Sequence, residues 1–167
     1  IVGEKSFLQN AGLAVDGATD LGRGVLVVAW PKGKTLAAAA DIAKPAVTRL
    51  AMPDPTKAIY GKAAAQYLEK AGLAKAVAGK LLAVATVPQV TTYLQSGEVD
   101  AGFVNRTDVM NAGDSIGGYL EIDPALYSPI EIVAVSVPGA KNPDAAKAFA
   151  VYLGTPEAQA IIKRHGL

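Results

Sequence analysis

Continuous apolar runs are the clearest pattern along this sequence. Residues 24–30 and 130–137 are rich in β-branched side chains, and each run is followed directly by a proline. Apolar runs without polar alternation are typical of strands that are covered on both faces, as in mostly parallel sheets. Three shorter runs of the same kind occupy residues 49–52, 81–85 and 101–104.

Apolar residues recur at helical spacing between these runs. Ala64, Tyr67, Leu68 and Ala71 follow the i, i+3, i+4, i+7 pattern of an amphipathic helix, and Gly72 is suited to end it. The sequence therefore predicts a helix that begins near residue 60.

Two more helices are predicted near the C-terminus. Residues 142–144 combine an N-capping asparagine, a proline at the first helical position and an acid in the first turn. We expect Ala146, Phe149 and Leu153 to form the buried stripe of this helix. A second helix is predicted to start at residues 155–157. Because strands and helices alternate along the chain, the predicted fold class is α/β.

The predicted elements divide into an inner and an outer set. Residues 24–138 form a predicted α/β lobe, called lobe two, in which the two long runs are the crossing strands. The flanking residues 1–23 and 139–167 contain helices but almost no predicted strand, so they are expected to form only part of a lobe one. The sequence thus predicts two lobes joined by two crossing strands.

Composition narrows the classes of function. The chain has 167 residues, of which 51% are apolar and 19% charged, so a sizeable core is expected. Sixteen Lys and Arg against fifteen Asp and Glu give a formal charge of +1, which argues against a nucleic-acid partner. There is no cysteine, and His165 is the single histidine. With no nucleophile–base pair and no metal-binding cluster visible, the sequence predicts a binding protein without a resident cofactor or metal, and not an enzyme.

One local pattern has chemical meaning. A strand-like run, a short loop and a helix start follow one another at residues 52–61 and again at residues 85–90. Both copies place the free N–H groups of a helix N-terminus at the carboxyl end of a strand, the edge at which α/β sheets bind ligands. Such N–H groups favour anions. Every α/β protein has helix starts of this kind, so the pattern alone does not single out an anion site.

Longer motifs are distributed over nearly the whole chain. They lie in residues 7–13, 52–64, 95–104, 128–130, 141–149 and 153–167. In these segments the sequence resembles the periplasmic molybdate-binding proteins of ABC importers. The resemblance implies a periplasmic-binding-protein-like fold, in which two α/β lobes joined by two crossing strands bind a tetrahedral oxyanion.

The same resemblance implies the ligand contacts. The backbone N–H groups of Tyr60 and Val87 are expected to donate to the oxyanion, together with a side chain at Asn105, where family members often carry tyrosine. An asparagine amide can still donate, but it is shorter and adds an acceptor. A binding surface that offers only hydrogen-bond donors favours fully deprotonated dianions such as molybdate, tungstate or sulfate. Protonated phosphate would need an acceptor for its O–H, and only Asp54 or Asn105 could supply it.

The function implied by the resemblance is that of a non-enzymatic solute-binding component of an ABC importer. Its expected ligand is molybdate or tungstate, its expected partner is a membrane permease, and its expected location is the bacterial periplasm or another extracytoplasmic space. Family members carry a further stretch before the position of Ile1, with the first strand and helix of lobe one, so we expect this chain to be the C-terminal part of such a protein.

Two alternative functions stay open at this point. The first is a solute-binding protein for a different anion or for a metal complex. The second is an interaction module that self-associates through its incomplete lobe, because exposed apolar helices must be covered.

Overall fold

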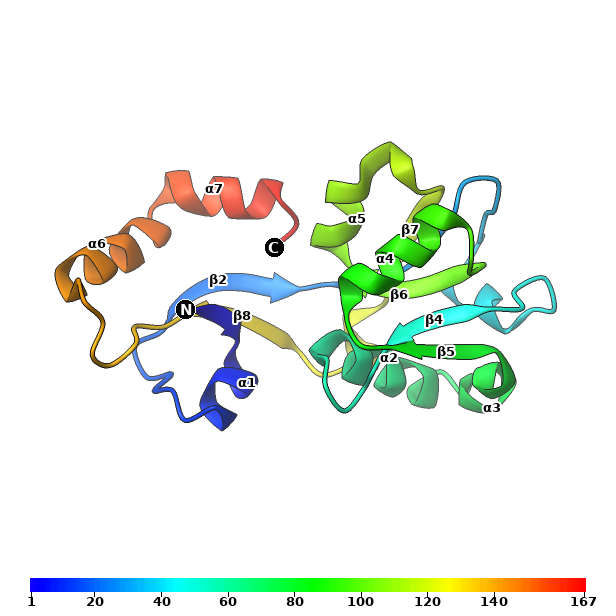
Figure 1. Ribbon diagram of the computed structural model, residues 1–167, viewed down its shortest axis with the longest axis horizontal. Coiled ribbons are helices and arrows are strands. Elements are labelled where there is room, and N and C mark those ends of the chain that lie inside the picture. The colour runs from blue at the N-terminus through cyan, green and yellow to red at the C-terminus, as the bar shows by residue number, and fades with distance from the viewer. The chain divides into compact units, whose positions relative to one another are not determined.

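The computed structural model describes residues 1–167, which form two compact units. Unit 1 consists of Ile1–Gly24 and Pro129–Leu167, and unit 2 consists of Val25–Ser128. The chain leaves unit 1 after Gly24 and returns to it at Pro129 (Figure 1). Each unit has its own sheet and is described by itself.

Unit 2 is built on a five-stranded mixed sheet. In spatial order its strands are β5 (Leu81–Val84), β4 (Leu50–Pro53), β6 (Ala101–Asn105), β3 (Leu26–Trp30) and β7 (Gly118–Glu121). β4 pairs in parallel with β5 and β6, whereas β3 pairs antiparallel with β6 and β7. The α/β class is confirmed, and the sheet is mixed: β4, β5, β6 and β7 share one direction, and only β3 runs against them. An apolar run indicates that both faces of a strand are covered, and it does not fix the strand's direction.

Helices cover both faces of this sheet (Figure 1). The helices of unit 2 are α2 (Ile59–Lys70), α3 (Ala74–Val77), α4 (Val87–Ser96) and α5 (Arg106–Ala112). Successive residues of a strand point to opposite faces. Accordingly, Phe103 meets Tyr67 of α2, with ring centroids 5.9 Å apart, while its neighbour Val104 is buried in a cluster with Val90 of α4 and Val109 of α5.

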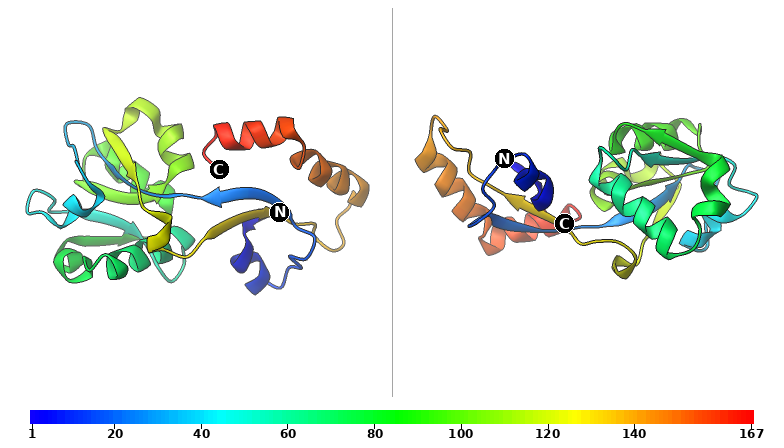
Figure 2. Two further views of the ribbon diagram at one scale, coloured as in Figure 1. Left: turned by 180° about the vertical axis from the view of Figure 1, so that it is seen from behind. Right: turned by 90° about the horizontal axis from the view of Figure 1, so that it is seen from below.

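Unit 1 contains a three-stranded antiparallel sheet, in which β8 (Ile130–Ala134) lies between β1 (Val2–Glu4) and β2 (Thr19–Gly24). Helix α1 (Lys5–Asn10) contacts β8. Helices α6 (Pro143–Leu153) and α7 (Pro156–Arg164) contact β2. Figures 1 and 2 show α1 and α7 on opposite sides of these strands.

The strands of unit 1 correct two expectations. Residues 1–23 contain β1 and nearly all of β2, although this segment was expected to contain almost no strand. Both are edge strands; β1 has three residues and β2 carries charged residues and glycine, so no apolar run marks either. The run from Ile130 was assigned to lobe two, but β8 pairs on both sides within unit 1. The division therefore falls at Pro129 and not after residue 138.

Helix α6 forms where the sequence predicts it, but its apolar stripe is not buried. None of its residues is buried, and Phe149 is 57% exposed. The N-terminal signals at residues 142–144 specify where the helix starts. Apolar spacing specifies which face of a helix prefers to be covered, and it does not supply the covering surface.

Asp100 ties the loop before β4 to the start of β6. Its carboxylate accepts hydrogen bonds from the N–H of Thr48 (2.7 Å), the hydroxyl of Thr48 (2.8 Å) and the N–H of Arg49 (3.1 Å). The Nζ of Lys34 lies 3.0 Å from its other oxygen. Burial opposes ionisation of Asp100, but these hydrogen bonds and the ion pair outweigh it and hold the pKa of Asp100 well below its usual value.

Asp100→Asn is therefore expected to destabilise the protein near neutral pH and to do so less in acid. A carboxyl group whose pKa is lowered by folding contributes stability that is fully present above its unfolded pKa and is lost as the pH falls through its folded pKa. Thermal unfolding of the wild type and of Asp100→Asn at about pH 6 and about pH 3 measures this pH-dependent contribution to stability. The difference in Tm between the two proteins should shrink at the lower pH, and an equal difference at both would contradict the assignment.

Candidate functional site

The carboxyl ends of three neighbouring strands lie side by side at one end of the sheet in unit 2. β4, β5 and β6 run in the same direction, and each is followed by a helix: α2 after β4, α4 after β5 and α5 after β6. Tyr60, Val87 and Asn105 lie at these three junctions, with the junction of Tyr60 between the other two. The residues predicted from the sequence therefore share the edge at which α/β sheets bind ligands.

The first turn of α2 has free backbone donors. Ala58 precedes the helix and has no side chain that could cap it. The N–H groups of Ile59, Tyr60 and Gly61 donate to no acceptor in the chain. Such groups are satisfied by water or by a ligand, and the helix dipole favours a ligand that is negatively charged.

A tight loop holds this turn against the neighbouring strand. The N–H of Asp54 donates to the carbonyl oxygen of Val84 at the end of β5 (2.7 Å), and the carbonyl oxygen of Asp54 accepts from the N–H of Ala58 (2.9 Å). One carboxylate oxygen of Asp54 accepts from the N–H and the hydroxyl of Thr56, at 2.8 and 2.6 Å. The hydrogen bonds from Thr56 lower the pKa of Asp54, which is thus an ionised and already engaged acceptor.

The side chain of Tyr60 is partly buried. It packs against the buried cluster formed by α4, α5 and the sheet. Burial raises the pKa of Tyr60 to about 12, with smaller contributions from the nearby Tyr127 and Asp108. The phenol therefore stays neutral at physiological pH, and its role at this edge is packing.

The start of α4 offers one further backbone donor. Thr86 caps the helix by accepting from the N–H of Gln89, but at 3.4 Å this is a long hydrogen bond. Pro88 has no N–H, and the N–H of Val87 donates to no acceptor in the chain. The Val87 side chain is buried in the same cluster as Tyr60, so the backbone of this first turn is firmly positioned.

Asn105 ends β6 and caps α5. Its Oδ1 accepts from the N–H of Asp108 at 2.7 Å, so the acceptor of this amide is engaged and its NH₂ group remains as the donor. The capping role follows from the sequence, because asparagine is favoured before a helix. Only the resemblance, and not the residue pattern, had pointed to this third junction.

Asp108 is the residue at this edge that sequence reasoning missed. Its Oδ2 is buried and has no hydrogen-bond partner, and burial raises the pKa of its carboxyl group. When ionised, this carboxylate opposes the binding of a negative ligand nearby. The available signal was its position three residues after Asn105, which places it in the first turn of α5.

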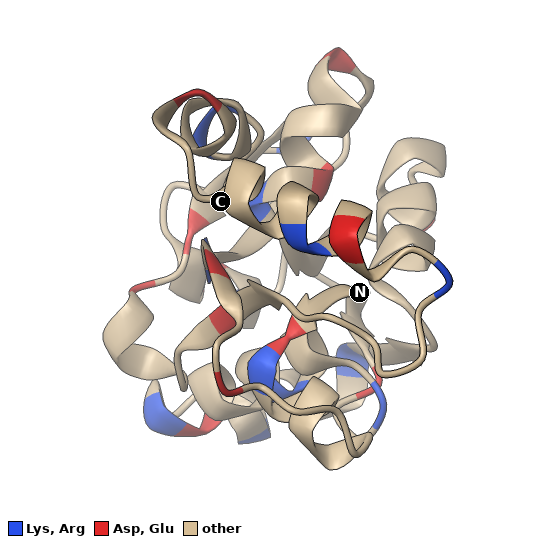
Figure 3. Ribbon diagram, turned by 90° about the vertical axis from the view of Figure 1, so that its left-hand side faces the viewer, with Lys and Arg blue, Asp and Glu red and all other residues tan.

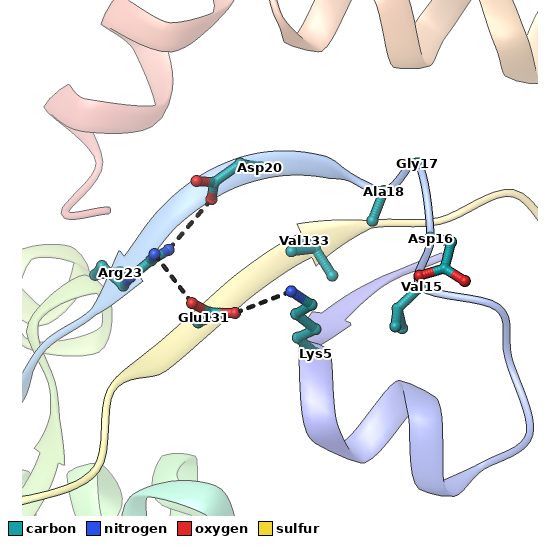
Figure 4. A pocket seen from close by; sticks show the side chains of 9 residues that line it. All are labelled: Lys5, Val15, Asp16, Gly17, Ala18, Asp20, Arg23, Glu131 and Val133. Carbon is teal, nitrogen blue, oxygen red and sulfur yellow. Dashed lines mark hydrogen bonds and ion pairs between the residues drawn. The ribbon is translucent and has the colours of Figure 1, made fainter.

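Unit 1 has a charged cavity of about 380 Å³ with a different character (Figure 4). The Oε2 of Glu131 lies 3.4 Å from the Nζ of Lys5, and its Oε1 lies 3.1 Å from the Nη2 of Arg23. The Nη1 of Arg23 lies 3.5 Å from the Oδ1 of Asp20. Asp16 adds another carboxylate to the lining. Because each cation is matched by an acid, this cavity has no excess of positive charge that would favour an anion.

The rest of the chain adds no metal-binding chemistry. No group of three or more His, Cys, Asp or Glu residues is arranged to hold a metal ion. Acidic and basic residues are interspersed over the elements (Figure 3), in keeping with the formal charge of +1. None of the helices combines the length and the apolar character that a membrane crossing requires.

Comparison with known proteins places the chain among its relatives. Residues 4–167 match the family described as bacterial extracellular solute-binding protein. The chain is 35% identical over 128 residues to the molybdate-binding protein ModA of Azotobacter vinelandii, which covers 76% of this chain and 51% of that protein. It is 31% identical over 125 residues to ModA of Rhodobacter capsulatus, covering 75% and 49%. The chain thus spans about half the length of these two relatives.

The fold agrees with this relationship. The structure of the periplasmic molybdate-binding protein of Azotobacter vinelandii superposes with a TM-score of 0.81 at 27% sequence identity, covering 96% of this chain and 72% of that one. The match covers nearly all of this chain. This chain belongs to the family of bacterial extracellular solute-binding proteins.

Proposed function

We propose that this chain is part of the solute-binding component of an ABC importer for molybdate or tungstate, and that unit 2 supplies one wall of the oxyanion site. The observation that carries the proposal is the pair of unengaged N–H groups of Tyr60 and Val87 at adjacent strand ends. The NH₂ group of Asn105 is the third proposed donor. Two relatives at 35% and 31% identity are named as molybdate-binding proteins, which supports this choice of ligand.

The charge state of the ligand follows from which acceptors are engaged. Asp54 accepts hydrogen bonds from Thr56 through one carboxylate oxygen and lies 3.7 Å from Lys57 through the other. Asn105 accepts one from Asp108. The unpaired Oδ2 of Asp108 is buried. A fully deprotonated dianion needs no acceptor. The wall therefore favours molybdate, tungstate or sulfate over hydrogen phosphate, and a different dianion is the alternative ligand within the same reading.

The expected affinity of this wall alone is low. A hydrogen bond to a charged group contributes about 1.5–3 kcal/mol, so three of them give about 5–9 kcal/mol if they add fully. Association itself costs at least about 4 kcal/mol. Binding in the millimolar range or weaker follows, and tighter binding needs further contacts that a longer protein would supply.

The partners and the location are part of the same proposal. A solute-binding component delivers its ligand to a membrane permease, and its place of work is the periplasm or another extracytoplasmic space. A second copy of the chain is a further proposed partner, and the observation that favours it is the uncovered apolar stripe of α6 in unit 1.

Thermal unfolding with added anions tests the proposed ligand class. A ligand at ten times its Kd raises the stability of the folded state by about 1.4 kcal/mol. Molybdate and tungstate, raised to roughly ten times the millimolar Kd expected above, should raise Tm in a saturable way, whereas phosphate at the same ionic strength should not. Equal shifts with all anions would indicate a general salt effect and would contradict a specific site.

Tyr60→Phe is expected to leave anion binding unchanged within about twofold. The proposed contact is the backbone N–H of residue 60, and the phenol of Tyr60 is largely buried and stays neutral. The measurement is the dependence of Tm on molybdate concentration for both proteins. Loss of the anion effect in this variant would mean that the phenol, and not the backbone, holds the ligand.

A further inference from the structure

Asp108 carries a buried side-chain oxygen that has no hydrogen-bond partner. The chain itself covers this Oδ2, while the backbone N–H of the same residue donates to the Oδ1 of Asn105 at 2.7 Å. Buried carboxylates in proteins are normally paired with a cation or with hydrogen-bond donors, because an unpaired charge away from water is costly. The carboxyl group of Asp108 is therefore easier to protonate than that of an exposed aspartate.

The elements packed against α5 supply no cation to this carboxyl group. α4, β3 and β6 contain no charged residue, and a groove of about 250 Å³ between α4 and α5 is lined by Asp108 together with uncharged side chains such as Thr91 and Gln95. The guanidinium of Arg106, the first residue of α5, lies 3.1 Å from the carboxylate of Glu121 on β7. The other titratable groups on the elements around α5 are an acid and four tyrosines: Asp114, Tyr60, Tyr93, Tyr119 and Tyr127.

Asp108 adjoins the proposed oxyanion wall. Its backbone N–H is bound by Asn105, the proposed side-chain donor. Its carboxyl group is close enough to Tyr60 to help raise the pKa of that phenol, and the backbone N–H of Tyr60 is the proposed donor at the next junction. Pro88, which follows Val87 at the start of α4, lines the same groove as Asp108. An ionised Asp108 therefore repels a dianion at these junctions.

A bound anion changes the balance of charges around Asp108. Without an anion, burial raises the pKa of the carboxyl group, whereas its position in the first turn of α5 favours the charged form through the helix dipole. A dianion at the wall adds repulsion to the cost of burial. Both of these effects favour the neutral acid.

We infer that Asp108 takes up one proton from solvent when the proposed wall binds its dianion, and that it thereby sets how anion affinity depends on pH. This role rests on the proposed function, because it requires a dianion at the wall. The ligand keeps both negative charges, and the carboxylate becomes a carboxylic acid. Affinity then rises as the pH falls through the range in which Asp108 titrates, and by reciprocity the bound anion raises the pKa of Asp108.

Sulfate titrations of Asp108→Asn test this coupling, since sulfate stays a dianion in mild acid, where molybdate takes up protons. The Kd is obtained from the amide shifts of Tyr60 and Val87 in ¹⁵N-labelled protein at constant ionic strength. The wild-type Kd should fall about tenfold between about pH 7 and about pH 4. The Kd of Asp108→Asn should stay within about twofold over this range, near the value that the wild type reaches in acid. Asp54 adds no such dependence, because hydrogen bonds from Thr56 keep its pKa low.

Asp114→Asn is the matched control. It makes the same change of charge at an exposed residue just beyond α5, so its Kd should follow that of the wild type at every pH. A second measurement needs no variant, because the ¹³C shift of the Asp108 carboxyl carbon reports its protonation in the wild-type protein. Saturating sulfate should raise the midpoint of that titration by about one pH unit, which corresponds to the tenfold change in Kd.

Two results would overturn the role of Asp108 and leave the proposed function standing. One is an Asp108→Asn protein whose Kd has the wild-type pH dependence, and the other is a carboxyl titration whose midpoint sulfate leaves unchanged. If neither sulfate nor molybdate shifted the amides of Tyr60 and Val87 in any of the three proteins, the proposed function and the role of Asp108 would both be overturned.

Discussion

Replacing Gly61 with alanine is expected to lower the stability of the protein by about 2–3 kcal/mol and to abolish anion binding. A Cβ at position 61 would overlap the carbonyl oxygen of Pro53 and would lie 2.8 Å from the carbonyl carbon and oxygen of Asp54. These are backbone atoms of the end of β4 and of the loop that follows it, so no side-chain rotation relieves the overlap. The first turn of α2 has to move, and the N–H of Tyr60 moves with it.

Gly79→Ala is the control for this substitution. No atom lies within 4 Å of the position that a Cβ would occupy at Gly79, and its backbone is not in the left-handed region. Its effect on stability should stay within about 0.5 kcal/mol. Chemical denaturation gives both values, and Tm with and without molybdate gives the anion effect. A Gly61→Ala protein of wild-type stability that still responds to molybdate would show that this close approach has no role.

Val87→Pro is expected to weaken anion binding by about tenfold to a hundredfold, and to lose about 1–3 kcal/mol of stability because it also removes the buried methyl groups of the valine. Removing the N–H deletes one hydrogen bond to a charged ligand, which is worth about 1.5–3 kcal/mol. The helix tolerates the change, because proline is favoured at its first position. Thr86 has ψ 157°, the extended conformation that a residue before proline prefers.

Val87→Ala separates the backbone from the side chain at the same position. This variant keeps the N–H and loses part of a buried side chain, so it should lose about 1–3 kcal/mol of stability while retaining anion affinity. The two substitutions are therefore expected to cost similar stability in denaturation experiments and to differ in their affinity in molybdate titrations. If Val87→Ala lost affinity and Val87→Pro kept it, the ligand contact would be the side chain and not the N–H.

The core of unit 2 was the part of the fold most accessible to sequence reasoning. The runs that became β3, β4 and β6 are apolar without alternation because helices cover both faces of their sheet, whereas β5 lies at the edge of the sheet and is only partly buried. The start of α6 was equally clear because Pro143 marks it, although Asn142 at the N-cap position makes no side-chain capping hydrogen bond. Strand direction was not accessible, since pairing depends on contacts between distant residues.

Unit 1 was predicted less well for a physical reason. β1 and β2 lie at sheet edges, where polar residues and glycine are tolerated, so no apolar run reports them. The exposure of Phe149 was equally inaccessible, because it depends on what lies opposite α6 and not on α6 itself. The proposed donors of the candidate site are backbone N–H groups, so no particular residue type marks them in the sequence. Only the helix starts that follow strands, together with the family resemblance, pointed to Tyr60 and Val87.

An NMR titration tests most directly whether the backbone N–H groups at the starts of α2 and α4 bind an oxyanion. Molybdate is added to ¹⁵N-labelled protein at constant ionic strength, and the amide resonances are followed. We predict saturable shifts, with one common Kd, that are largest for Tyr60 and Val87 and absent with phosphate. Shifts confined to other residues, such as the charged cavity around Arg23, or no shifts at any molybdate concentration, would contradict the claim.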